Sequence, residues 1–109
     1  RGAAPWAALR VPVVSPDDWT PTEIGLGLCE LERLRREVDA STAVLVGAMP
    51  DTRDSATALA RTCGVSGREA RRRRAVADVA KKLPQALALL RSGQVSAEHV
   101  AALAPVAKV

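Results

Sequence analysis

Residues 19–24 read Trp-Thr-Pro-Thr-Glu-Ile, and together they carry the signals for the start of an α-helix. Thr20 is a favourable N-cap residue, Pro21 suits the first helical position, and Glu23 completes a capping box with the threonine. Trp19 and Ile24 stand where a hydrophobic staple would hold the incoming chain. Apolar residues then recur every three or four positions, at Ile24, Leu28, Leu31, Leu34, Val38, Leu45 and Met49. This spacing predicts one helix over residues 21–49, roughly 44 Å long.

Beyond Pro50, the chain shows the start and stop signals of shorter helices. Glycines supply left-handed stops, serines precede two of the apolar stretches, and Pro84 starts a new helix. The expected helices run from Asp51 or Asp54 to Gly64, from Ser66 (with Glu69 in a second capping box) to Leu83, from Gln85 to Leu90 before Gly93, and from Ser96 to about Pro105. No stretch alternates like a strand except residues 11–14, which Pro12 interrupts. We therefore expect an all-α fold with one long N-terminal helix, a helix-turn-helix-like unit and two short helices.

The composition limits the class of protein. The chain has 109 residues, of which 48% are apolar but only 2% aromatic, so Leu, Val and Ala must build the core of one small domain. The proline-containing residues 1–18 are expected to form an extended or flexible arm before a helical domain over residues 19–109. No apolar run reaches the roughly 18 residues of a membrane span. One His and two Cys cannot form an ordinary zinc site by themselves.

The chain ends and a few single residues add further expectations. The chain begins at Arg1 and ends inside an apolar periodic stretch, which indicates a fragment of a larger protein. Cys29 and Cys63 are expected as small buried side chains in a reducing, cytoplasmic setting. His99 is expected to touch the backbone at a helix start, because no second His or acid pair accompanies it for catalysis. Nothing in the chain is assigned a catalytic role.

Positive charge is concentrated in one block of the sequence. Residues 61–91 carry nine basic and two acidic residues, whereas the whole chain has a net charge of +4. Such an asymmetry points to a polyanionic partner. The alternative to such a partner is a helix face that is simply exposed to solvent. On that face, Arg74–Asp78 and Asp78–Lys82 would form weak ion pairs between residues four positions apart.

The same block resembles a helix-turn-helix. Ala60 is small enough for a close helix crossing, Gly64 suits a sharp turn, and Ser66 caps the second helix. Arg73 departs from the pattern, because such motifs place an apolar residue there. The second helix would present its first turns to a major groove. The candidate phosphate or base contacts are Arg68, Arg71, Arg72 and Arg74.

Four segments of the chain resemble the N-terminal helical domain of the 13E12-repeat proteins, also called the domain-of-unknown-function-222 family. They are residues 18–23, 64–72, 83–87 and 90–100. The resemblance implies a helical module that precedes a C-terminal HNH endonuclease segment, in which His and Asn residues hold a divalent metal. This chain has one His and no Asn, so the resemblance assigns neither a cofactor nor nuclease chemistry to its residues.

Two functions from different classes remain open. The first is a non-catalytic module that binds or targets double-stranded DNA through the arginine-rich helix. The second is a helical interaction or oligomerisation scaffold without nucleic-acid contact. Its interaction face would be Ile24, Leu28, Leu31, Leu34 and Val38, which would pair with a partner helix or a second copy.

Overall fold

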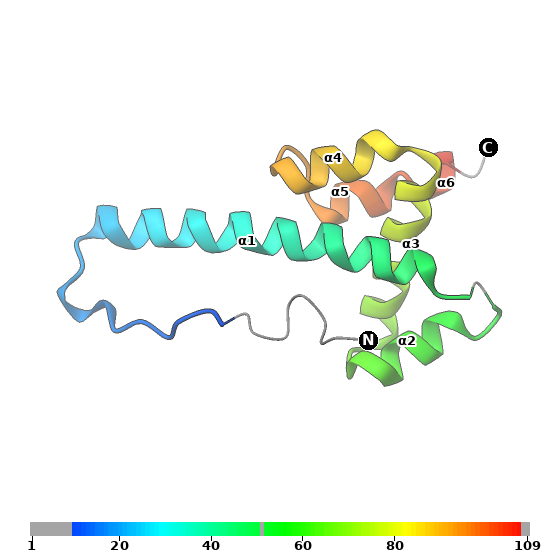
Figure 1. The fold of residues 1–109 in the computed structure, drawn as a ribbon, viewed down its shortest axis with the longest axis horizontal. Helices are drawn as coiled ribbons and strands as arrows, with labels where there is room; N and C mark the ends of the chain where they lie inside the picture. Colours follow the sequence, from blue (N-terminus) through cyan, green and yellow to red (C-terminus); the bar gives the residue numbers. More distant parts are fainter. Residues whose placement is uncertain (1–9, 51, 108–109) are drawn as a thin grey trace, which may run out of the picture.

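A computed structural model of the chain describes residues 10–50 and 52–107, and within these residues the fold is all-helical with no strand (Figure 1). A short 3₁₀ turn, η1 (Pro16–Asp18), precedes the helices. These are α1 (Pro21–Ala48), α2 (Ser55–Cys63), α3 (Gly67–Lys82), α4 (Pro84–Ser92), α5 (Ala97–Ala102) and α6 (Ala104–Ala107). Part of the expected arm and the alternative cap Asp51 lie outside the described residues.

Helix α1 begins as its sequence predicts. The Glu23 backbone N–H donates to Thr20 Oγ1 at 3.2 Å, and the Thr20 N–H donates back to Glu23 Oε1 at 2.9 Å, so the capping box is confirmed. Trp19 lies against Gly27, where an added Cβ would meet the indole ring at 3.3 Å. Residues 10–18 then run back beside the N-terminal half of α1 (Figure 1).

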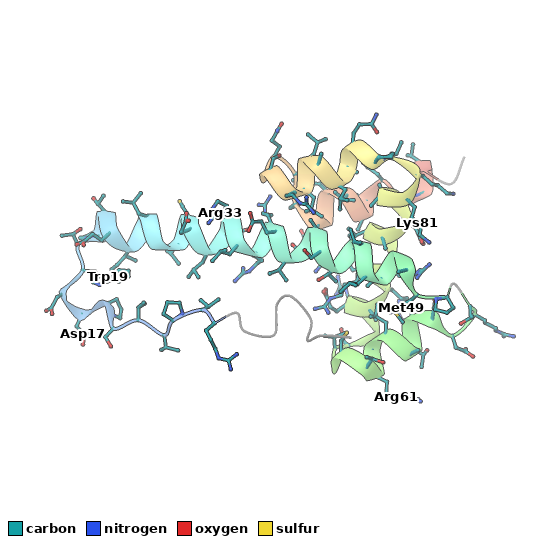
Figure 2. The ribbon with its side chains drawn as sticks, viewed as in Figure 1. Asp17, Trp19, Arg33, Met49, Arg61 and Lys81 are labelled. Carbon is teal, nitrogen blue, oxygen red and sulfur yellow. The ribbon has the colours of Figure 1, made fainter. Side chains whose placement is uncertain are left out.

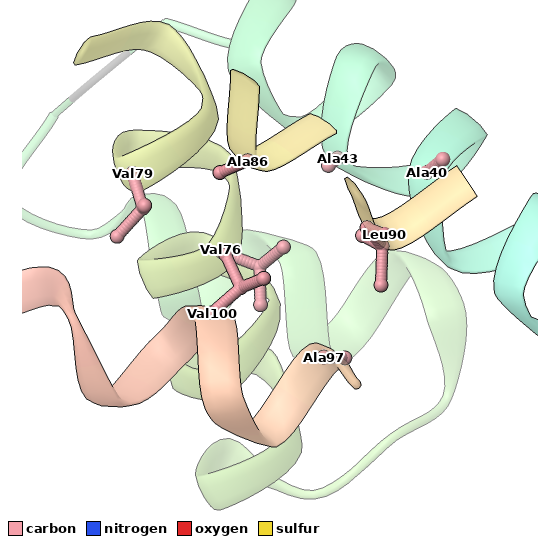
Figure 3. Packing of buried hydrophobic residues seen from close by; sticks show 8 residues of the cluster. All are labelled: Ala40, Ala43, Val76, Val79, Ala86, Leu90, Ala97 and Val100. Atoms are coloured by element: carbon pink, nitrogen blue, oxygen red, sulfur yellow. The ribbon is translucent and has the colours of Figure 1, made fainter. Parts of the chain in front are cut away.

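The core lies at the C-terminal half of α1. The main cluster joins α1 to α3, α4 and α5 (Figure 3) and consists of Ala40, Ala43, Val76, Val79, Ala86, Leu90, Ala97 and Val100. A second cluster joins α1 to α2 and α3 through Val46, Leu59, Ala70 and Ala77. Half of these side chains are alanines, which let the helix backbones approach closely. No residue of 21–39 is buried, so the N-terminal half of α1 projects from the body.

Three expectations about local structure are wrong. Ser66 Oγ accepts from the Glu69 N–H at 3.0 Å, but the Glu69 carboxylate binds Arg72 and Arg73 instead of closing a second capping box. The last helix breaks at Leu103 into α5 and α6, because Pro105 has no N–H with which to continue it. Cys29 and Cys63 are exposed and free, since the packed helices leave those faces of α1 and α2 uncovered.

Candidate nucleic-acid and interaction surfaces

The turn between α2 and α3 sets the direction of the arginine-rich helix. Gly64 has φ of +67°, a left-handed conformation that favours glycine. The Val65 N–H donates to the Ala60 carbonyl at 3.0 Å and ends α2. Ser66 then caps α3, whose inner face carries Ala70 and Ala77 into the core. Three of the four candidate arginines, Arg68, Arg71 and Arg72, lie on the other faces of α3.

Arg74 is not at the surface. Its side chain is only 10% exposed, and it lies on the same side of α3 as Ala70 and Ala77. Its Nη1 donates to the Val46 carbonyl at 2.9 Å, near the C-terminal end of α1, and its Nη2 lies 3.4 Å from Asp78 Oδ1. A guanidinium at the C-terminal end of a helix is favourably placed against the helix dipole. Arg74 therefore joins two helices, and the candidate nucleic-acid surface does not include it.

Glu69 holds two further arginines. Arg72 donates from Nε to Oε1 and from Nη2 to Oε2, both at 2.7 Å, and Arg73 Nε donates to Oε2 at 3.0 Å. The hydrogen bonds from Arg72 lower the pKa of Glu69 to about 2. In return, the hydrogen bond to Glu69 raises the pKa of Arg72. Sequence reasoning missed this role, although the three-residue and four-residue spacings were visible, because the glutamate was assigned to a capping box.

Asp39 of α1 faces the same group of charges. Burial raises the pKa of its carboxyl group, and the positive charge of Arg72 partly opposes that shift. Arg72 thus lies near two acidic side chains, which reduces the positive field it presents to solvent.

Arg68 and Arg71 remain as the open arginines of the candidate site. Both are exposed, and neither forms an ion pair within the described part of the chain. They border an open hollow of about 580 Å³ at the N-terminal end of α3, together with Ser66, Glu69, Arg72 and Glu98. Two of the four sequence-predicted arginines therefore stand where a polyanion can reach them without displacing an acidic partner.

The candidate interaction face lies on the projecting half of α1. Four of its side chains are well exposed: Ile24 by 40%, Leu28 by 63%, Leu31 by 46% and Val38 by 62%. Leu34 is half-buried. The arm lies opposite this face, and Figure 2 shows Trp19 at the bend where the arm turns into α1. Between the arm and the helix lies an apolar hollow of about 440 Å³. The arm lines it with Val11, Val14 and Trp19, and the helix lines it with four residues of the face, Ile24, Leu28, Leu31 and Leu34.

Charged residues flank this apolar face. Arg33 Nη2 lies 2.7 Å from Glu30 Oε1, and Arg36 Nε lies 3.0 Å from Glu32 Oε1. Arg36 also donates from Nη1 to the Val95 carbonyl at 2.7 Å, a contact between α1 and the α4–α5 loop that sequence reasoning missed. The flanks of the projecting half are thus neutralised mainly within α1 itself.

The other chemistry-bearing residues do not form a cluster. His99 Nδ1 accepts from the Ser96 N–H at 3.4 Å, and Ser96 Oγ accepts from the His99 N–H at 3.2 Å, so His99 completes a capping box at the start of α5. Among residues 10–50 and 52–107, no group of three His, Cys, Asp or Glu side chains is placed to hold a metal ion. None of the described helices is both long and apolar enough to cross a membrane.

Comparison of the chain with models of known protein families, with curated proteins and with solved structures gives no match. A function for the chain therefore has to be inferred from the geometry and chemistry of its two surfaces.

Proposed function

We propose that the chain is a non-catalytic helical module that binds double-stranded DNA through the N-terminal turns of α3. The observation that carries the proposal is the exposure of Arg68 and Arg71 at the open hollow, without acidic partners in the described part of the chain. Guanidinium groups bind phosphate oxygens and guanine edges in a bidentate manner. Two unpaired arginines on adjacent turns of one helix fit that chemistry.

The arrangement of α2 and α3 supports a helix-turn-helix-like unit. Helix α2 packs on α3 through the cluster that includes Leu59 and Ala70, and the left-handed Gly64 makes the turn between them. In such units the first turns of the second helix enter the major groove. Arg68 and Arg71 lie in these turns, and Arg72 lies beside them with its charge partly offset by Glu69.

The test is a binding titration with a matched loss of charge. We expect Arg68→Ala with Arg71→Ala to weaken binding of a fluorescent 20-base-pair duplex by about tenfold or more at moderate salt. The control, Arg35→Ala with Arg91→Ala, removes two exposed charges elsewhere and should change affinity by less than about threefold. If both arginines contact phosphates, the negative slope of log affinity against log salt should become about 1.8 less steep in the first variant. Equal losses in the two variants would refute the proposed surface.

The resemblance to the 13E12-repeat family suggests the wider context. We propose that the module belongs to an HNH-endonuclease-type protein, in which the divalent metal is held by a separate HNH segment. The free, exposed thiols of Cys29 and Cys63 support a reducing compartment such as the cytoplasm. The sequence of the intact gene product tests the family assignment, because it must contain the HNH motif downstream of residue 109.

A further inference from the structure

We propose that Arg72, held in place by Glu69, recognises a guanine base in the major groove and gives the DNA surface a sequence preference. The inference rests on the proposed DNA-binding function and assigns different tasks to its arginines. Arg68 and Arg71 bind phosphates of any sequence, whereas Arg72 distinguishes one base pair from the others.

The hydrogen bonds of Arg72 leave one edge of its guanidinium group free. Nε donates to Glu69 Oε1 and Nη2 donates to Glu69 Oε2, both at 2.7 Å. The carboxylate therefore occupies the side edge of the group, which consists of the Nε–H and one N–H of Nη2. Because a guanidinium carries five N–H donors in one rigid plane, the end edge keeps both N–H groups of Nη1 and the second N–H of Nη2.

The end edge is accessible to solvent. Within the described part of the chain, Arg72 Nη1 makes no hydrogen bond, and it is not among the buried polar atoms that lack a partner. The Arg72 side chain is 32% exposed. It lines the hollow of about 580 Å³ that Arg68 and Arg71 also border. An acceptor in this hollow therefore lies within reach of the free donors of Arg72.

The charges around Arg72 favour a base edge over a phosphate. Glu69 offsets the charge of the guanidinium, and Asp39 and Glu98 add negative charge nearby. A phosphate is attracted by net positive charge, which the two open arginines retain because they form no ion pair within the described residues. The edge of a base is uncharged, so its binding depends on hydrogen-bond geometry more than on net charge.

The end edge of Arg72 matches guanine better than any other base. In the major groove, guanine presents the two acceptors O6 and N7, and an arginine donates to both of them at once. Adenine presents the N6 donor beside N7, and cytosine presents the N4 donor, so a donor of Arg72 would meet another donor. Thymine offers the single acceptor O4 beside a methyl group.

Glu69 acts as a positioning residue for Arg72. Its carboxylate also accepts from Arg73 Nε at 3.0 Å, and its backbone N–H donates to Ser66 Oγ at 3.0 Å, so Glu69 is itself held from two sides. A side chain that is ordered before binding loses less conformational freedom when it binds. The two bonds to Glu69 also fix the plane of the Arg72 guanidinium, which a bidentate contact with one base requires.

Selection from a pool of duplexes of about 20 base pairs with randomised central positions, followed by titration of the recovered sequence, tests the proposal. We expect the wild-type chain to select a guanine at one position and to bind that duplex about tenfold more tightly than its A·T counterpart. Replacing this guanine by 7-deazaguanine, which lacks N7, should weaken wild-type binding by about threefold or more. Arg72→Ala should bind the G·C and A·T duplexes within about twofold of each other.

The matched control is Arg71→Ala, which removes an arginine of the same helix that has no ion pair within the described residues. It should weaken binding of both duplexes by the same factor and keep the guanine preference. It should also make the negative slope of log affinity against log salt about 0.9 less steep, whereas Arg72→Ala should leave that slope nearly unchanged.

Glu69→Gln tests the positioning role. Glutamine offers one acceptor oxygen in place of two, so it cannot hold both donors of the Arg72 side edge. The guanine preference should fall below about threefold. Affinity for the A·T duplex should stay equal or rise, because a negative charge leaves the surface, whereas a merely structural role would lower affinity for both duplexes. Circular dichroism verifies that all variants remain helical.

The outcomes separate this inference from the proposed function. Wild-type binding without a guanine preference, or a preference that survives Arg72→Ala, would overturn the guanine recognition and leave the DNA-binding surface standing. A preference that survives Glu69→Gln would overturn the positioning role of Glu69. A wild-type chain that binds no duplex would overturn both the proposed function and this inference.

Discussion

At the scale of single residues, Arg74 shows that a charged side chain in a basic run can belong to the core. Its guanidinium donates to the Val46 carbonyl at 2.9 Å and pairs with Asp78, so it fastens α3 to the end of α1. Hydrogen bonds to charged groups contribute about 1.5–3 kcal/mol each. We expect Arg74→Met, which keeps most of the volume, to lower the free energy of unfolding by about 2–3 kcal/mol in urea titrations.

The comparison residue is Arg71, which is exposed and lies one turn earlier on α3. Arg71→Met should change the free energy of unfolding by no more than about 0.5 kcal/mol. The two substitutions should affect DNA affinity in the opposite order. Arg71→Met should weaken binding, whereas Arg74→Met should leave it nearly unchanged, because Arg74 lies outside the proposed surface. A fold that tolerates both substitutions equally would contradict the structural role given to Arg74.

Glu69 makes stability depend on pH. The arginine hydrogen bonds lower its pKa in the folded chain from an ordinary 4.5 to about 2. A carboxyl group whose folded pKa is depressed stabilises the fold above its unfolded pKa and loses that effect as pH falls toward the folded value. The stabilisation should therefore be complete at pH 6 and disappear between about pH 4.5 and pH 2. Because part of the carboxylate faces water, we expect about 1–2 kcal/mol rather than the full linkage value.

Urea unfolding of the wild-type chain and of Glu69→Gln at several pH values measures this contribution. The two proteins should differ by about 1–2 kcal/mol at pH 6 and converge by pH 2. A difference that persists unchanged at pH 2 would mean that the carboxylate charge is not its source.

At the scale of elements, the sequence predicts the starts and ends of helices, because these depend on residues that are close together along the chain. The capping box of Thr20 and Glu23 and the left-handed Gly64 and Gly93 all follow from residues within a few positions of each other. The packing of α3 against α1 depends on contacts far apart in the sequence. For that reason the buried position of Arg74 was not predictable from a run of four arginines.

Alanine substitutions at Gly64 and Gly25 should change stability in opposite directions. Neither Gly64 nor Gly25 has an atom within 4 Å of an added Cβ, so backbone conformation alone decides each effect. Gly64 has φ of +67°, and Gly64→Ala should lower the free energy of unfolding by about 1 kcal/mol. Gly25 lies inside α1, and Gly25→Ala should increase the helical signal in circular dichroism and add up to about 1 kcal/mol to the stability of that segment. Destabilisation by both substitutions would show that Gly25 is needed for something other than helix geometry.

At the scale of the whole molecule, the two halves of α1 differ in what holds them. The C-terminal half buries Ala40, Ala43 and Val46 in the two core clusters, whereas residues 21–39 bury no side chain. The sequence predicted one continuous helix. It did not show where the packing of this helix against the other helices ends, because the apolar spacing continues through both halves. The C-terminal half packs against α3 and so positions its arginines.

Amide hydrogen exchange makes this difference measurable. Exchange follows local opening, which costs least where few apolar contacts are buried. Amides of residues 25–36 should therefore exchange about tenfold or more faster than those of residues 40–48. Uniform protection along α1 in dilute protein would contradict the division of this helix into a supported half and a projecting half.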